Sequence, residues 1–336
     1  MMMGPRRGVA LLLGLLLSLL SAEAAQAVCN INSAGMSMSP GTASTGTYTF
    51  PNAPVAQAIA VTISGTYTTN ASGGTCTLAL SFQRSSYPPA TMASVSGGAA
   101  TLPYTIRSTA SGGNTLLFTG SSVSLSNVLQ YSFASAGGNR TNVPFTASLT
   151  IYVLMQPNSP QAAGSYSDTL TAWVFNIASG NSVYSRTFTV TGTVAKACRI
   201  GGVSSGPIDT ATIPVTATGS VNTAAISRSY ANIMCNTPSN LQLTSQNGGV
   251  RTTAIAPSGF TNIIDYTSAA TFSGATATLD TSTNPLASGP EAGTAVPTTG
   301  TTPSGSISVS ITPRANTARL LSGSYADVLT ITVTPQ

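Results

Sequence analysis

The sequence predicts an all-β protein built from two tandem domains, and three observations lead to this prediction. Apolar and polar residues alternate with period two in segments such as 147–153, 307–311 and 329–333, which is typical of strands with one buried face. No segment repeats its apolar residues convincingly at helical spacing. The order of two cysteines followed by Gly-Ser-Tyr-x-Asp-x-Leu-Thr occurs twice, with the motif at 164–171 and again at 323–330. The sequence therefore predicts two immunoglobulin-like β-sandwiches of roughly 140–170 residues each.

The composition argues against catalysis. The chain of 336 residues has 12 Lys and Arg, 7 Asp and Glu, and no histidine, so catalytic classes that depend on imidazole are excluded. The carboxylates are widely scattered, whereas paired-carboxylate hydrolysis needs two of them close together. The positive charge is diffuse and mostly arginine, which makes a nucleic-acid role unexpected. We expect no enzyme activity, no cofactor and no metal site.

The first 27 residues have the features of a secretory signal peptide. Arg6 and Arg7 form a positive start, and an apolar run of 12 residues follows at 9–20, too short for the ~20 residues that span a bilayer. Ala25-Gln26-Ala27 fits a cleavage site, with 22–24 as an alternative. The mature chain is then expected to begin at Val28.

The four cysteines are expected to form two disulfides, because an exported protein folds outside the reducing cytosol. Cys29, Cys76, Cys198 and Cys235 allow three pairings. The repeated order of the motifs favours the local pairing, Cys29–Cys76 and Cys198–Cys235, because each copy then holds one bond.

The repeated motif has different surroundings in its two copies. We expect domain one at 28–182, closed in cis by a strand at 183–195 that carries Phe188, Val190 and Val194 on one face. Domain two is expected at 196–336, and only Thr334-Pro335-Gln336 follow its last strand.

The second sandwich should therefore lack its final edge strand. An incomplete sandwich exposes backbone hydrogen-bonding groups and an apolar groove. The groove is expected to be lined by Leu329, Ile331, Val333 and a facing strand near Ile200. A strand from another chain can fill a groove of this kind.

These features resemble the spore coat U domain family, which includes subunits of archaic chaperone–usher pili. The resemblance lies in the signal peptide, an early cysteine, a second cysteine several tens of residues on, and a terminal Gly-x-Tyr-x-Asp-x-Leu-Thr strand. The stretch 188–198 is similar to the N-terminal donor segment of ordinary subunits of such pili. Because Val28 directly precedes Cys29, the mature N-terminus is expected to have no donor segment.

The resemblance thus implies the two-domain tip adhesin, which accepts a strand without giving one. It further implies an adjacent pilin subunit, a periplasmic chaperone and an outer-membrane usher as partners. The protein would pass through the periplasm to the pilus tip at the cell surface, where it would mediate surface attachment and biofilm formation. A secreted structural protein of a spore coat or matrix and a carbohydrate-binding module are the alternatives.

The resemblance also implies apolar loops at the distal end of domain one that bind a surface. In an immunoglobulin-like sandwich, the loop after the second-cysteine strand is expected at that end. The candidates are that loop and an apolar triplet, which could instead be a short buried strand: Tyr87, Pro88, Pro89 and Met92; Leu116, Leu117 and Phe118. The sequence leaves the ligand open among an abiotic surface, a glycan and a host protein.

The tyrosine and aspartate of the repeated motif could be mistaken for acid–base residues. Tyr166 with Asp168 and Tyr325 with Asp327 recur identically in both copies. We interpret them as structural residues at the start of a strand, like the tyrosine corner of immunoglobulin-like domains.

Overall fold

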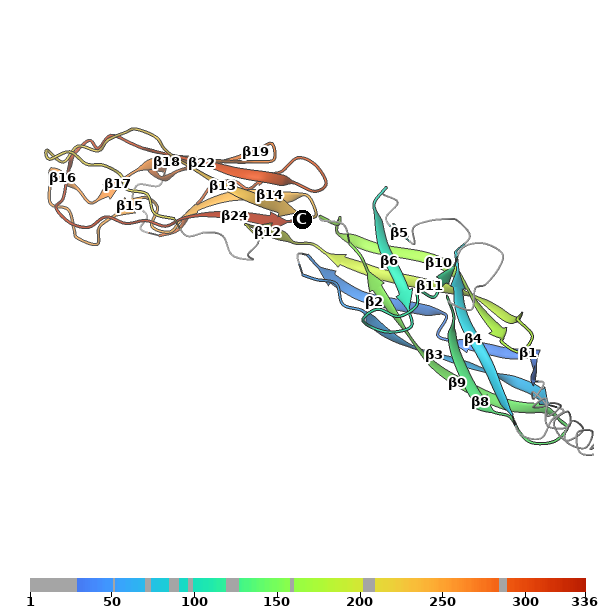
Figure 1. Ribbon diagram of the computed structural model, residues 1–336. Helices are drawn as coiled ribbons and strands as arrows, with labels where there is room; N and C mark the ends of the chain where they lie inside the picture. The colour runs from blue at the N-terminus through green and yellow to red at the C-terminus, as the bar shows by residue number, and fades with distance from the viewer. Residues whose placement is uncertain are drawn as a thin grey trace, which may run out of the picture.

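The computed structural model describes residues 29–50, 52–69, 74–84, 91–95, 99–118, 127–157, 160–201, 209–283 and 289–336, which form two domains arranged end to end (Figure 1). The described residues contain strands and turns, a 3-10 helix at Thr281–Thr283, and no α-helix. Accordingly, none of them belongs to a helix long and apolar enough to cross a bilayer. The predicted all-β fold is confirmed. The proposed signal peptide lies outside the described residues.

Domain one, formed by β1 to β11, consists of two facing layers. One layer has the order β1-β3-β9-β6, and the other contains β2-β11-β10 with β4, β7 and β8. The short strand β5 pairs with both β6 and β10 and thereby joins the layers. The strands are β1 (Cys29–Ser39), β2 (Thr42–Thr49), β3 (Gln57–Thr69), β4 (Thr75–Gln83), β5 (Thr91–Ser94), β6 (Thr101–Arg107), β7 (Leu117–Phe118), β8 (Leu129–Ala134), β9 (Arg140–Met155), β10 (Gly164–Asn176) and β11 (Asn181–Ala195).

The last strand of domain one lies inside its sheet. β11 is antiparallel to β10 on one edge and parallel to β2 on the other. Phe188, Val190 and Val194 all point into the core, where they are at most 2% exposed. The Phe188 ring packs against Phe82 with 4.9 Å between the ring centres. The period-two pattern at 188–194 therefore marks a buried face, and β11 starts two residues before the expected 183.

Domain two, formed by β12 to β24, also has two layers. A five-stranded sheet with the order β12-β13-β22-β18-β19 faces a sheet in which β14 pairs with β24 on one edge and with β20 and β21 on the other. The strands are β12 (Cys198–Ile200), β13 (Ile226–Cys235), β14 (Ser239–Ser245), β15 (Val250–Arg251), β16 (Phe260–Thr261), β17 (Ile263–Ile264), β18 (Tyr266–Phe272), β19 (Ala275–Asp280), β20 (Glu291–Ala292), β21 (Val296–Pro297), β22 (Ser304–Pro313), β23 (Arg319–Leu320) and β24 (Leu329–Pro335).

Each domain contains one disulfide. Cys29 is bonded to Cys76 and Cys198 to Cys235, which is the local pairing predicted from the repeat. The first bond connects β1 and β4, which belong to opposite layers, whereas the second connects the neighbouring strands β12 and β13. The copies therefore place the same covalent link differently.

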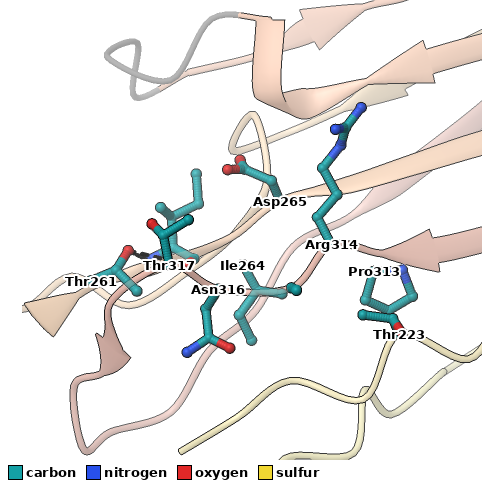
Figure 2. Close-up of a pocket in the computed structure, with 10 residues that line it drawn as sticks. Thr223, Thr261, Ile264, Asp265, Pro313, Arg314, Asn316 and Thr317 are labelled. Atoms are coloured by element: carbon teal, nitrogen blue, oxygen red, sulfur yellow. Dashed lines mark hydrogen bonds between the residues drawn. The ribbon is translucent and has the colours of Figure 1, made fainter.

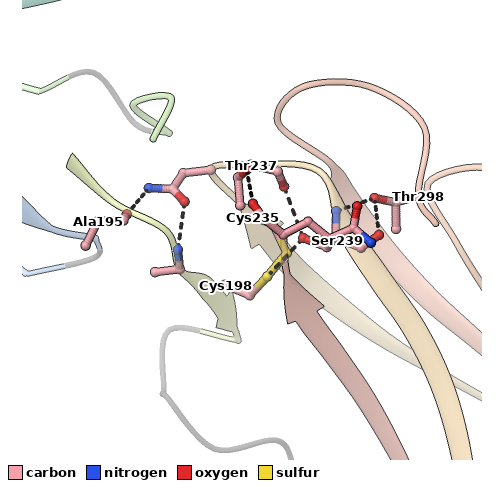
Figure 3. The surroundings of a disulfide bond; sticks show 9 residues. Ala195, Cys198, Cys235, Thr237, Ser239 and Thr298 are labelled. Carbon is pink, nitrogen blue, oxygen red and sulfur yellow. Dashed lines mark hydrogen bonds between the residues drawn. A yellow bond between two sulfur atoms is a disulfide. The ribbon is translucent and has the colours of Figure 1, made fainter. Parts of the chain in front are cut away.

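The end of β11 leads directly into domain two through residues 195–198, called the joint below, and Asn236 forms hydrogen bonds to this segment. The buried Asn236 amide donates to the Ala195 carbonyl (2.8 Å) and accepts from the Ala197 N–H (2.8 Å), beside the Cys198–Cys235 bond (Figure 3). The Asn236 carbonyl accepts from the Ala163 N–H of domain one (2.8 Å). One side chain thus connects the exit of β11 to the start of β12.

Candidate strand-accepting groove in domain two

The motif tyrosine forms the same local hydrogen bond in both domains. The Tyr166 hydroxyl donates to the carbonyl of Ala162 (2.6 Å), and the Tyr325 hydroxyl donates to that of Leu321 (2.9 Å). Both acceptors lie four residues upstream, as in a tyrosine corner. The structural interpretation of these tyrosines is confirmed.

The motif aspartate connects the two layers of each sandwich. Asp168 accepts from the Tyr104 hydroxyl on β6 (2.7 Å), and Asp327 accepts from the Tyr266 hydroxyl on β18 (2.6 Å). Burial, reinforced by the neighbouring carboxylate, raises the pKa of both phenols well above the ordinary value. The shared contact makes Tyr104 and Tyr266 equivalent positions of the repeat.

The strands that carry the motif differ in their second neighbour. In domain one, β10 pairs with β11 on one edge and with β4 and β5 on the other. In domain two, β24 pairs with β14, and no described strand pairs with its other edge. The inward side chains follow this difference: Leu170 is 2% exposed, whereas its counterpart Leu329 is only half-buried.

An apolar groove lies along the open side of β24. It forms a cavity of about 670 Å³. The chain from Gly323 to Ile331 forms one wall, the segment 209–215 forms the opposite wall, and inward side chains of β13, β18 and β22 lie between them. The larger apolar and aromatic residues of the lining are Ile213, Val215, Ile226, Tyr230, Val250, Ile264, Tyr266, Val309, Ile311, Tyr325, Val328, Leu329 and Ile331. Its extent matches a strand, because nine residues from 323 to 331 span about 30 Å when extended.

The segment 209–215 is a wall without continuous strand pairing. At one end, Asp209 accepts from the Arg228 guanidinium (2.9 Å) and the Tyr230 hydroxyl (3.4 Å). At the other end, Val215 forms an isolated bridge with Val221. Most of the residues between these ends are exposed. In domain one, β2 lies beyond β11 and pairs with it along its length.

The four groove residues expected from the sequence do not all lie in this cavity. Leu329 and Ile331 line it. Val333 and Ile200 are half-buried and pack against the same core, but they lie outside the lining because β12 approaches β24 near the joint. The expectation missed the wall at Ile213 and Val215, although the apolar alternation at 213–215 was a signal for it.

The prediction of exposed apolar loops is wrong for three residues. Met92 and Leu116 are fully buried and Phe118 is 7% exposed, whereas Leu117 is half-buried. β7 pairs in parallel with β4, and the Leu116 N–H donates to Ile106 of β6, so this segment belongs to the packed sandwich. The alternative of a short buried strand is therefore correct for 116–118. Tyr87, Pro88 and Pro89 lie outside the described residues.

The strand direction explains the failure at the second-cysteine loop. β4 is antiparallel to β10 and ends opposite Thr171, so the chain after Gln83 leads toward the joint and away from the distal end. Arg84, the next residue, contacts Asp168 at 3.2 Å. The distal end of domain one is where β10 ends and β1 begins, and there the Asn176 amide donates to the Cys29 carbonyl (2.6 Å).

A second, more polar cavity lies elsewhere in domain two. It has a volume of about 550 Å³, and Thr261, Asp265 and Arg314 are among its lining residues (Figure 2). Arg314 pairs with Asp280, while Oδ1 of Asp265 is buried without a hydrogen-bond partner. Within the described residues, no group of three or more Cys, Asp or Glu side chains could hold a metal ion.

No family model and no curated protein match the chain. Among solved structures, it is similar to a chain of the chaperone–tip adhesion subunit pre-assembly complex from the archaic chaperone–usher Csu pili of Acinetobacter baumannii. That match has 14% identity and a TM-score of 0.38, over 91% of this chain and 100% of that one. It is also similar to a G168D mutant of the CFA/I adhesin CfaE of enterotoxigenic E. coli, with 12% identity and a TM-score of 0.31, over 88% of this chain and 93% of that one. A third similar structure is the CupB6 tip adhesin from Pseudomonas aeruginosa, with 11% identity and a TM-score of 0.30, over 91% of this chain and 94% of that one.

Proposed function

We propose that this protein is the terminal, adhesive subunit of a chaperone–usher fibre. Domain two accepts a strand from the adjacent subunit, and domain one contacts the surface to which the cell attaches. A periplasmic chaperone covers the groove before assembly, and an outer-membrane usher exports the subunit to the cell surface. Attachment through domain one then supports biofilm formation.

The observation that carries the proposal is the open edge of β24 beside an apolar groove. An unpaired sheet edge with apolar side chains below it is a template for a further strand. Domain one contains that arrangement in its completed form, because β11 fills the corresponding place between β10 and β2. A strand entering domain two is therefore expected to run antiparallel to β24 and parallel to 209–215.

The use of β11 supports a terminal position. Within the described part of the chain, the donor-like segment identified from the sequence is β11, and both of its edges are paired inside domain one. Its inward side chains are also buried there. The described residues thus provide a place for a strand but leave no such strand free for a neighbour.

The proposal is tested on the full chain with a synthetic peptide that has the sequence of residues 183–195. The peptide should protect the backbone N–H groups of β24 and 209–215 from hydrogen exchange, because they gain strand partners, and should leave β10 unchanged. At a peptide concentration of 100 times Kd, the free energy of unfolding of domain two should rise by about 2.7 kcal/mol.

The matched control is the same peptide with Phe188→Asp and Val190→Asp, which keeps the length and removes the apolar face. Equal protection by both peptides, or no protection by either, would contradict strand acceptance. The adhesive role needs a separate measurement: deletion of the gene should abolish attachment of the producing cells, and immunogold labelling should place the protein at fibre ends.

A further inference from the structure

The two domains can be aligned residue by residue around the strand position. Tyr166 and Tyr325 are equivalent through the motif, so the residues that follow them, Ser167 and Ala326, are equivalent too. Ser167 pairs with Ala93 of β5, and Ala326 pairs with Arg251 of β15. The residues that precede these partners, Met92 and Val250, therefore occupy the same place.

An independent pairing supports this alignment. Met92 pairs with Leu102, two residues before Tyr104, and Val250 pairs with Ile264, two residues before Tyr266. The same two tyrosines align the ends of β9 and β22. Tyr104 pairs with Met155, and Tyr266 pairs with Pro313. Met92 and Met155 thus have shorter counterparts in domain two, Val250 and Pro313.

Met92 and Met155 both lie beside the place where β11 has a glycine. Gly192 lies opposite Tyr166 on the inward face. A Cβ atom at this position would lie 2.5 Å from Thr45 Oγ1, 3.1 Å from Met155 Sδ and 3.2 Å from Met92 Cε. The Gly192 backbone does not have a positive φ, so the glycine is required for space rather than for conformation.

The equivalent place in domain two has more room. Val250 reaches less far than the methionine it replaces, and it lines the 670 Å³ groove together with Ile264, Tyr266 and Tyr325. Pro313, the shorter counterpart of Met155, lines the second cavity instead. Close packing favours filling such space with an apolar side chain, because an apolar void forfeits contacts.

We propose that the strand accepted by domain two differs from β11 at one position: it carries an apolar side chain, rather than glycine, opposite Tyr325. This inference rests on the proposed strand acceptance and names the partner by its chemistry, an extended segment of another subunit with apolar residues opposite Leu329, Asp327, Tyr325 and Gly323. This position distinguishes the strand site of domain two from the site that β11 fills in domain one. A side chain there is excluded from domain one by Thr45, Met92 and Met155, while domain two gains packing from it.

Three peptides with the sequence of residues 183–195 test the proposal against the full natural chain, whose domain-one position is filled by its own β11. One peptide keeps Gly192, and the other two have the substitutions Gly192→Val and Gly192→Thr. Fluorescence anisotropy of each labelled peptide gives its affinity for the chain. Valine and threonine are both β-branched and similar in shape, so both share the gain in strand propensity over glycine. The valine peptide should bind about tenfold more tightly than the threonine peptide, because its side chain adds apolar contact without a buried hydroxyl.

Each result decides a different claim. Binding of all three peptides with valine no tighter than threonine, or with glycine the tightest, overturns the inference and leaves strand acceptance standing. Failure of every peptide to bind overturns strand acceptance as well. A Val250→Met chain restores one methionine to the groove and should reduce the preference for valine over glycine. In the intact chain, Gly192→Val should instead lower the melting temperature of domain one.

Discussion

The same eight-residue motif begins a fully enclosed strand in domain one and a half-open strand in domain two. Its tyrosine and aspartate form equivalent hydrogen bonds in both copies. The difference begins at the leucine: Leu170 is covered by β11, whereas Leu329 faces the groove. The motif therefore specifies how its strand starts and how it is connected to the opposite layer. It does not specify whether the strand has one neighbour or two.

This difference teaches that one neighbouring strand can decide whether a repeated sequence forms a core or a binding surface. The inward side chains of β24 are apolar like those of β10, and they already pack on the core of domain two. Their remaining exposure comes from the open edge. A single added strand would supply both the missing backbone partners and the missing apolar contacts.

The largest effect is expected from removing the closing strand's main side chain. Phe188→Ala should destabilise domain one by about 3–5 kcal/mol, because it deletes a fully buried ring and leaves a cavity. The sole tryptophan, Trp173 on β10, reports unfolding of domain one by its fluorescence. Hydrogen exchange should show domain two unchanged. Equal loss in both domains would mean that the two do not unfold independently.

A matched pair of substitutions compares the stability that the motif leucine contributes in each domain. Leu170→Ala should cost domain one about 2–5 kcal/mol, as for a buried leucine. Leu329→Ala should lower the free energy of unfolding of domain two by less, about 1 kcal/mol, because the Leu329 side chain is only half-buried and no described strand packs on its groove side. Chemical denaturation followed by hydrogen exchange gives both values. Similar costs at the two leucines would contradict the assignment of β24 as an open edge.

The smallest difference is expected from the shared tyrosine–aspartate contact. Burial raises the folded-state pKa of Tyr104 and Tyr266, so each stabilises the fold fully below the unfolded pKa near 10 and loses that contribution as the pH rises toward the folded value. The free energy of unfolding should therefore fall above about pH 10, by about 1.4 kcal/mol per pH unit for each tyrosine.

Tyr104→Phe and Tyr266→Phe should each make this alkaline slope shallower in their own domain. The measurement is denaturation at a series of pH values from 8 to 11. A reduced slope in only one domain would show that the contact is not equivalent in the two copies, and would limit the comparison to the motif itself.

Local pattern was sufficient for much of the fold. Alternation at 188–194 predicts a buried face, and the repeated order of cysteines predicts their pairing, because both depend on periodicity and sequence order. The tyrosine corner could be predicted for the same reason, since its acceptor lies only four residues upstream. Exposure of Met92 and Leu116 could not be judged locally. A short apolar segment is compatible with an exposed loop and with a buried edge, and the choice depends on the strands that pair with it: β6 and β10 for Met92, and β4 and β6 for Leu116.

The sequence by itself determined the β class, the duplication, the two disulfides and the apolar faces of β11 and β24. Only the tertiary structure decided where the groove lies and what forms its walls. The segment 209–215 and the chain from Gly323 to Ile331 line one groove although about 110 residues of sequence separate them, and Val250 from another strand lines it beside Tyr325. Contacts between distant segments arise from strand order and direction, and a period-two pattern contains neither.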